Sequence, residues 1–138
     1  MSISVADRHE MRIDSEDDIA LVRRKVRDLA QSCRFDVFLA AAVTTAASEL
    51  ARNVWVHAGK GRAVIERVND DSRFGVRVEF EDEGPGIADI DRVMAGGYST
   101  ANSMGLGLSG SRRLVDEFSI DSKPGHGTRI KIVKWAPY

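Results

Sequence analysis

Cysteine is nearly absent from this chain of 138 residues. The single cysteine, Cys33, excludes an internal disulfide and a cysteine-rich metal site. Cys33 falls among apolar residues at helical spacing, so we expect a small core residue rather than a reactive thiol. The chain also lacks a charged N-terminal segment followed by a long apolar run, and it lacks any stretch of membrane-spanning length. These absences predict a cytoplasmic protein.

An excess of charge of one sign is missing as well. The 20 Lys and Arg residues nearly balance the 21 Asp and Glu residues, which leaves a net charge of -1. Bulk electrostatics therefore gives no attraction to nucleic acid or to an anionic membrane. The length fits one domain over residues 1–138, in which roughly two thirds of the unfolded surface can be buried. Recognition is expected to come from a specific site.

The motifs of two large groups of ATP-dependent enzymes are absent too. The sequence has no G-x-x-x-x-G-K-[ST] loop and no H-R-D or D-F-G set. P-loop and eukaryotic-type kinase architectures are therefore disfavoured. A sensor histidine kinase would need a phosphoacceptor helical hairpin upstream, for which the residues before Asp14 are too few.

Apolar periodicity predicts two long helices near the start of the chain. The first runs from about Ser15 to Gln31 after a capping box at residues 14–18, and a short strand around residues 11–13 precedes it. The second is rich in alanine, begins near Asp36, ends at about Val56 and is stopped by Gly59 and Gly61. The basic residues of the first helix are either a solvated face or a docking surface for a partner; they are Arg23, Arg24, Lys25 and Arg27.

The second half of the chain predicts strands at residues 63–68, 74–80, 118–122 and 128–135. A short helix is expected around residues 90–94, and another runs from the glycine-rich residues 105–110 through Val115. Phe74, Val76, Val78 and Phe80 share one side of their strand, so that side should face a helical layer. Residues 96–103 are small and polar enough to act as a lid.

The second helix carries a polar face with chemical potential. Glu49, Asn53 and His57 recur at every fourth position and therefore lie together on that helix. The amide oxygen of Asn53 suits Mg²⁺ that is also held by phosphates, and Glu49 could orient or deprotonate an attacking hydroxyl. Such a stripe can also be an ordinary solvated helix face. For His57, a helix cap or a core hydrogen bond is expected rather than catalysis.

Two glycine-rich runs add to this face. Asp82 ends a predicted strand and precedes Gly84 and Gly86, so its carboxylate could accept from an exocyclic amine while the glycines let backbone approach a flat ring. The second run opens a helix, whose backbone N–H groups would favour phosphate. Its residues are Gly105, Leu106, Gly107, Leu108, Ser109 and Gly110. Together, the first glycine run, Asn53 and the second glycine run could bind adenine, Mg²⁺ and phosphates, respectively.

With these motifs in fixed order, the chain resembles the ATP-binding domain shared by gyrase-type topoisomerases, Hsp90, sensor histidine kinases and mismatch-repair ATPases, the GHKL family. The asparagine box covers residues 49–58, the two glycine boxes cover residues 82–86 and 105–108, and Gly127-Thr128 is similar to a further adenine-side element. Over nearly the whole chain the likeness is strongest to small serine/threonine kinases of bacterial anti-sigma and stressosome signalling, of the RsbT type. This resemblance implies an α+β fold, a two-layer sandwich with helices on one face of a mixed, mostly antiparallel sheet.

The resemblance also implies roles for individual residues. Asn53 would bind Mg²⁺, Glu49 would be the general base, and Asp82 would take the adenine amine of ATP. The remaining residues would shape the pocket or support the base: Gly84, Gly86, Ile87, Gly105, Leu106, Gly107, Leu108 and Thr128. Two departures stand out: Ser103 replaces a glycine found in many relatives, and no Lys or Arg lies between Arg92 and Arg112. The charge of the terminal phosphate would then be met by Mg²⁺, by backbone N–H groups, or by Arg52 or Arg112.

The leading hypothesis is therefore an ATP- and Mg²⁺-dependent kinase that phosphorylates a serine or threonine of a STAS-domain antagonist protein. By resemblance, the released kinase would then activate a PP2C-type phosphatase. The main alternative is a switch that binds ATP without transferring phosphate, either sequestering a sigma factor or activating a phosphatase. The missing basic residue in the predicted lid makes this alternative credible.

Overall fold

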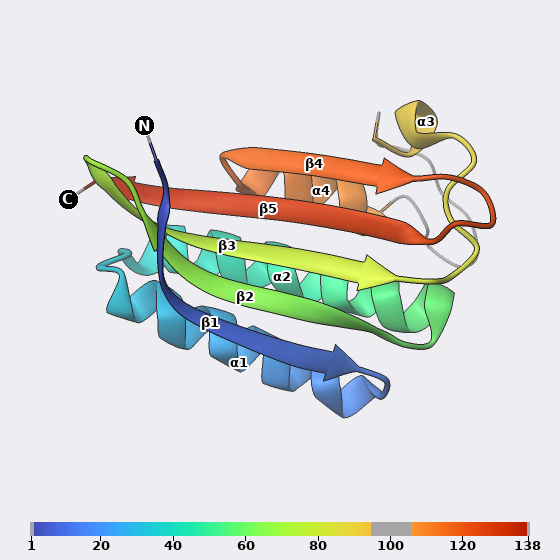
Figure 1. Cartoon of the computed structure of the whole chain (residues 1–138), viewed down its shortest axis with the longest axis horizontal. Helices are drawn as coiled ribbons and strands as arrows, with labels where there is room; N and C mark the ends of the chain where they lie inside the picture. Colours follow the sequence, from blue (N-terminus) through green and yellow to red (C-terminus); the bar gives the residue numbers. More distant parts are fainter. Residues whose placement is uncertain (1, 95–105, 138) are drawn as a thin grey trace.

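The computed structural model of the chain describes residues 2–94 and 106–137 (Figure 1). Within these ranges five strands form one sheet in the order β1-β2-β3-β5-β4. In chain order the elements are β1 (Ser4–Ile13), α1 (Glu16–Ser32), α2 (Val37–Ala58), β2 (Gly61–Asn69), β3 (Arg73–Asp82), α3 (Ile90–Met94), α4 (Leu106–Leu114), β4 (Glu117–Ser122) and β5 (Thr128–Pro137). Every strand pairing in this part of the chain is antiparallel, so the predicted α+β class is confirmed, but the sheet is antiparallel throughout rather than mixed.

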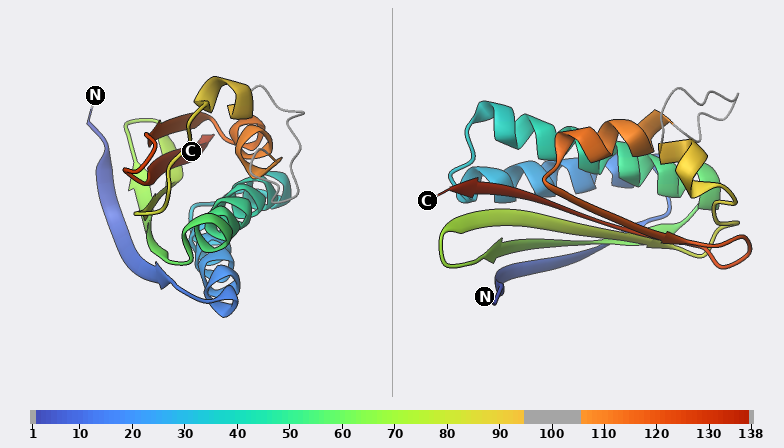
Figure 2. Two further views of the ribbon diagram at one scale, coloured as in Figure 1. Left: turned by 90° about the vertical axis from the view of Figure 1, so that its right-hand side faces the viewer. Right: turned by 90° about the horizontal axis from the view of Figure 1, so that it is seen from above.

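The helices cover one face of the sheet, as both views in Figure 2 show. Side chains alternate along β3: Val76, Val78 and Phe80 are buried beneath the helices, whereas Arg77 and Glu79 lie on the opposite face. The predicted orientation of this strand is therefore confirmed. Burial of these apolar side chains between the two layers is the main stabilising contribution to the fold.

Helix α2 crosses the middle of the helical layer. Asp36 caps its start, since the side-chain oxygen accepts a hydrogen bond of 2.8 Å from the backbone N–H of Leu39. Its buried alanines allow close packing, and Gly59 ends the helix in the left-handed conformation with φ 79°. Gly61 was wrongly expected to stop the helix, because it is the first residue of β2.

Helix α1 begins one residue after Ser15, but the predicted capping box is only half present. The Ser15 side chain makes no capping hydrogen bond. Instead the Asp18 carboxylate accepts a bond of 3.0 Å from the backbone N–H of Asp14, and this bond lowers the pKa of Asp18. At the other end of α1, Cys33 is buried, as expected for a core residue, and burial raises the pKa of its thiol.

Strand β1 is longer than the expected strand around residues 11–13, because it pairs with β2 from Ser4 to Ile13. Its polar residues hid it from the apolar pattern. Asp7 and His9 form a close pair on one side, with 3.1 Å between carboxylate and imidazole. Arg8 and Glu10 join ion pairs on the other side. Backbone pairing with β2 therefore extends this strand through a polar segment that an apolar pattern does not reveal.

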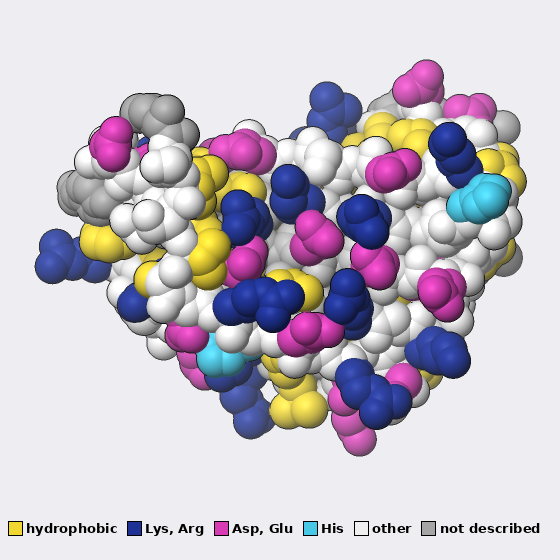
Figure 3. Space-filling model, viewed as in Figure 1, with side chains coloured by type: hydrophobic (Ala, Val, Ile, Leu, Met, Phe, Trp, Pro, Cys, Tyr) yellow, Lys and Arg dark blue, Asp and Glu magenta, His cyan; other side chains and the backbone are white. Residues whose placement is uncertain are grey.

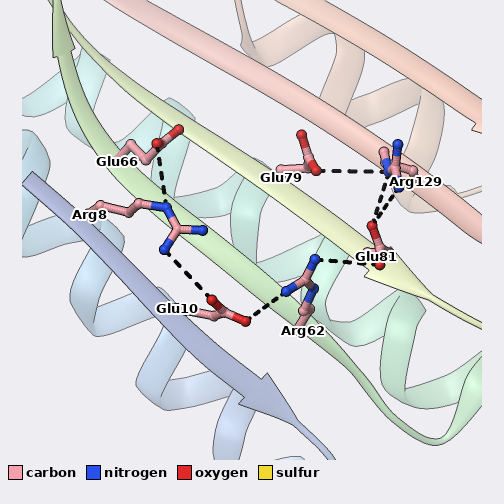
Figure 4. A network of polar contacts seen from close by, with 7 residues as sticks. All are labelled: Arg8, Glu10, Arg62, Glu66, Glu79, Glu81 and Arg129. Carbon is pink, nitrogen blue, oxygen red and sulfur yellow. Dashed lines mark hydrogen bonds and ion pairs between the residues drawn. The ribbon is translucent and has the colours of Figure 1, made fainter. Parts of the chain in front are cut away.

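The face of the sheet opposite the helices is covered by charges of both signs (Figure 3). Four strands contribute to a network of ion pairs, drawn in Figure 4, whose members are Arg8, Glu10, Arg62, Glu66, Glu79, Glu81 and Arg129. Each such exposed pair contributes little to stability. Their mutual pairing nevertheless keeps this face polar.

The described helices include none that combines the length and the apolar character needed to cross a membrane.

Candidate functional site

A pocket lies between the helical layer and the ends of β3 and β5. Its walls come from the second half of α2, the loop after β3 and the start of α4. The lining residues are Leu50, Asn53, Val54, His57, Phe80, Asp82, Pro85, Gly86, Ile87, Leu108, Thr128 and Ile130. Six residues predicted for the site thus meet in one place: Asn53, Asp82, Gly86, Ile87, Leu108 and Thr128.

Helix α2 contributes two polar side chains, one turn apart, to this pocket. The Nδ2 atom of Asn53 and the Nε2 atom of His57 are buried, and neither has a hydrogen-bond partner. Buried polar groups without partners are rare and costly, so both atoms point to a ligand that completes them. We expected a cap or core hydrogen bond for His57. For its Nε2 atom this expectation is wrong, because that atom has no partner within the protein.

Asp82 ends β3 and faces the same pocket. Its carboxylate accepts a hydrogen bond of 2.9 Å from the backbone N–H of Gly84. Burial raises the pKa of Asp82, opposed by the Gly84 N–H, by His57 and by the backbone N–H of Thr128. Burial likewise lowers the pKa of His57, opposed by the charge of Asp82. The pocket therefore disfavours charge on either residue and couples the two electrostatically.

Glycines shape the loop that carries Asp82. Gly86 adopts φ 77°, and a Cβ there would collide with the carbonyl oxygen of Lys123. Gly84 does not line the pocket, but a Cβ on it would lie 2.7 Å from the Cβ of Ala58. The absence of side chains therefore lets this loop close onto both α2 and the β4–β5 turn.

The second glycine run is described in part. Gly105 lies outside the described residues, as do residues 96–103, so the structure gives no view of the predicted lid. Leu106 and Gly107 form the first turn of α4, and Leu108 is buried in the pocket wall. Of this glycine run, Leu108 in the first turn of α4 is therefore the residue that the structure places in the pocket wall.

Glu49 lies outside the pocket lining. It is exposed on α2, one turn before Asn53, so it stands beside the pocket rather than within it. Arg52 and Arg112 are also exposed, and neither lines the pocket. The described pocket lining contains no Lys or Arg side chain.

One buried polar residue at the site, Ser122, was missed by sequence reasoning. It ends β4, and its hydroxyl contacts Ile87, Gly127 and Thr128. Its position could have been inferred, because Ser122 follows Phe118 and Ile120 at every second position of a strand that faces the helices.

Comparisons with known proteins agree with this geometry. Residues 39–137 match the family described as "Histidine kinase-, DNA gyrase B-, and HSP90-like ATPase". The chain is 46% identical over 129 residues to "Serine/threonine-protein kinase RsbT" of Bacillus subtilis (strain 168), a match that covers 94% of this chain and 97% of that protein. It is 29% identical over 99 residues to "Anti-sigma F factor" of Caldanaerobacter subterraneus subsp. tengcongensis, covering 67% and 68% of the two chains.

A solved structure shows the same fold at low sequence identity. It is "The crystal structure of SiaB-SiaC complex from Pseudomonas aeruginosa", with a TM-score of 0.56, 15% identity, and coverage of 96% of this chain and 91% of that one. The family match spans well over half of the chain, and the RsbT match spans nearly all of it. The chain therefore belongs to the histidine kinase-, DNA gyrase B- and HSP90-like ATPases and, among them, to the RsbT-type serine/threonine-protein kinases.

Proposed function

We propose that this kinase transfers the terminal phosphoryl group of ATP, with Mg²⁺, to a serine or threonine of a STAS-domain antagonist or stressosome protein. The observation that carries the proposal is the convergence of Asn53, Asp82 and Thr128 in one pocket beside the start of a helix. Each part suits a different part of a nucleotide. The family match supports the use of ATP.

Asp82 and Thr128 form the base end of the proposed site. They are partners in the register of β3 and β5, so their side chains emerge on the same face of the sheet. An ionised carboxylate accepts hydrogen bonds, which suits the exocyclic amine of adenine. The apolar walls formed by Ile87, Leu108 and Ile130 suit the faces of a flat ring.

Asn53 is the proposed holder of Mg²⁺. The buried Nδ2 of Asn53 has no hydrogen-bond partner and could donate to a phosphate oxygen, while the amide oxygen of the same side chain would be the metal ligand. No group of three or more His, Cys, Asp or Glu residues in the described part forms a metal cluster, so an all-protein cage is not expected there. When bound, Mg²⁺ would neutralise charge on the phosphates.

Glu49 is the proposed general base. Its exposed position beside Asn53 lets a hydroxyl on another protein approach it. The acceptor oxygen would form a bond to the terminal phosphorus while the bond between that phosphorus and ADP breaks. The proton of the hydroxyl would pass to the Glu49 carboxylate. The backbone N–H groups at the start of α4 would stabilise phosphate charge.

The proposed partners follow from the same relatives. Arg23, Arg24 and Arg27 are exposed on α1, so this basic face is open to an acidic surface of a substrate protein. After phosphorylation the partner would lose affinity, and the released kinase would bind and activate a PP2C-type phosphatase.

One observation supports a second candidate, an ATP-dependent binding switch that transfers nothing. The described pocket lining has no Lys or Arg side chain to meet the terminal phosphate, and a 29% identical relative is named an anti-sigma factor. Such a switch would sequester a sigma factor or activate a phosphatase according to its nucleotide state.

Labelled ATP separates the two candidates. The chain is incubated with γ-labelled ATP, Mg²⁺ and a STAS-domain protein encoded beside it. The kinase proposal expects label on a serine or threonine of the partner, and it expects chelation of Mg²⁺ to abolish the label. An unlabelled partner, together with intact ATP binding, would overturn phosphoryl transfer and favour the switch.

A further inference from the structure

The hydroxyl of Ser122 connects three segments around the base end of the pocket. Ser122 is only 8% exposed. Its Oγ accepts a hydrogen bond of 2.9 Å from the backbone N–H of Ile87 and donates one of 3.0 Å to the carbonyl oxygen of Gly127. The same atom lies 2.8 Å from Oγ1 of Thr128. One buried hydroxyl therefore takes part in three hydrogen bonds.

The direction of the third bond follows from the other two. A hydroxyl has one proton to donate and two lone pairs that accept. The Ile87 N–H can only donate, and the Gly127 carbonyl can only accept, so the Ser122 proton is committed to Gly127. All three bonds exist together only if Thr128 donates its own proton to Ser122. The Thr128 hydroxyl then has only lone pairs left for the pocket.

Thr128 sits between Ser122 and Asp82. It is the register partner of Asp82 on β3 and of Ser122 on β4, so the three side chains lie side by side on the helical face of the sheet. Asp82 and Thr128 both line the pocket. An ionised Asp82 is likewise an acceptor, so the pocket presents two neighbouring acceptors and no side-chain donor from this pair.

We propose that Ser122 is a positioning residue that sets base selectivity: by fixing the Thr128 hydroxyl as an acceptor, it suits the pocket to a 6-amino purine and against a 6-oxo purine. An amine has two N–H groups, one for each acceptor. A carbonyl oxygen in the same place would face two acceptors, and only the N1–H of the 6-oxo ring could donate to one of them, so at least one acceptor would stay unpaired, which is a basis for rejection. This inference rests on the proposed nucleotide site.

Selectivity between ATP and ITP tests the inference, because ITP replaces the 6-amino group by oxygen. Dissociation constants for both nucleotides are measured by calorimetry on the wild type, Ser122→Ala and a matched control, Ser119→Ala. Ser119 is exposed on the same strand. In Ser122→Ala the Thr128 hydroxyl can turn and donate, so the ratio of the ITP constant to the ATP constant should fall about threefold to tenfold. The Ser119 variant should keep the wild-type ratio.

A second pair of variants tests whether Ser122 acts through Thr128. Thr128→Val removes the hydroxyl and should itself lower the ratio, and adding Ser122→Ala to it should change the ratio no further. Ser122→Cys keeps the size of the side chain with a weaker donor and acceptor, so it serves if the alanine variant does not fold. A purely structural role would weaken both nucleotides together and leave the ratio unchanged.

The outcomes are distinct. A folded Ser122 variant with the wild-type ratio would overturn the inference while leaving the proposed function intact. An equal fall of the ratio in the Thr128→Val background would also overturn it, because Ser122 would then not act through Thr128. A wild-type chain that binds neither nucleotide would overturn the proposed function as well.

Discussion

The backbone of Gly86 lies directly against the carbonyl oxygen of Lys123, so closely that no Cβ fits between them. The neighbouring Pro85 carbonyl accepts a hydrogen bond of 2.8 Å from the Gly125 N–H. The loop that follows Asp82 is thus packed onto the β4–β5 turn by backbone contacts, in addition to the bond from Ile87 to the Ser122 hydroxyl. The shape of the proposed base pocket depends on this contact, since Gly86 and Ile87 form part of its wall.

Gly86→Ala should therefore damage both stability and nucleotide binding. The left-handed conformation alone costs an L-residue about 1–2 kcal/mol, and the collision with Lys123 adds to it. Thermal unfolding should show a lower midpoint, and calorimetry should show at least tenfold weaker ATP binding. Gly110→Ala is the control: it is a helical position in α4 with open space, where alanine should stabilise by about 1 kcal/mol. Equal effects of the two substitutions would contradict the role of the Gly86 contact.

Asp82→Asn should separate stability from binding. Because burial raises the pKa of Asp82, the folded state holds its proton more tightly than the unfolded state does. The contribution of Asp82 to the free energy of unfolding is then lost as pH rises from about the ordinary value of 3.8 through the raised pKa, and it stays lost at neutral pH. Asparagine removes this penalty and keeps an oxygen for the Gly84 N–H.

The expected result for Asp82→Asn is a higher unfolding midpoint at pH 7 with ATP affinity at least about tenfold weaker, since a charged acceptor for the amine is lost. Asp121→Asn, an exposed position on β4, is the control and should change neither quantity appreciably. An Asp82→Asn protein that binds ATP like the wild type would show that this carboxylate does not contact the base.

The fold and the site differ in how much of them the sequence reveals. Apolar periodicity and glycines predicted α2 and β3, because these features obey local rules of spacing, whereas the meeting of Asn53 with Asp82 was implied by the order of the motifs and by the resemblance to the ATPase family. Two features escaped. The full length of strand β1 depends on its antiparallel pairing with β2, and Ser122 matters through its bond to Ile87, far away in the chain. Partners distant in sequence leave no local period, so only the folded sheet shows them.

His57→Gln should flatten the acid side of the stability profile. Burial lowers the pKa of His57 from its ordinary value of 6.5, so the unfolded state binds this proton more readily than the folded state. The contribution of the neutral His57 to the free energy of unfolding is then fully present above about pH 6.5 and is lost as pH falls below this value. Histidine titrates between about pH 5 and 8. Chemical denaturation at several pH values in this range measures how the free energy of unfolding changes with pH. The glutamine variant should lose less stability over the acidic part.

The control for His57 is His126→Gln, on the exposed β4–β5 turn, which should keep the wild-type slope. Other groups face His57 in the pocket, chiefly Asp82 on β3, whose charge opposes the lowered pKa of the imidazole. The comparison is therefore repeated in the Asp82→Asn background. There the acid-induced loss of stability should differ more between histidine and glutamine at position 57. Parallel profiles for wild type and His57→Gln would disprove the idea that the imidazole titrates at a buried site.

The last prediction assigns phosphoryl transfer to Glu49 and Mg²⁺-dependent ATP binding to Asn53. Glu49 is exposed beside the pocket, whereas the Asn53 amide is buried in its wall, so loss of each should affect a different step. Glu49→Gln should lower the rate of phosphoryl transfer about 10²–10⁴-fold with little change in ATP affinity, as expected for loss of a general base. Asn53→Ala should weaken ATP binding only when Mg²⁺ is present, because the metal ligand is missing. Transfer of label and calorimetry with and without Mg²⁺ measure the two effects.

Glu79→Gln, on the opposite face of the sheet, should match the wild type in both assays. If Glu49→Gln transfers phosphate at the wild-type rate, another group must take the proton, and the carboxylate beside the pocket would have no part in the chemistry.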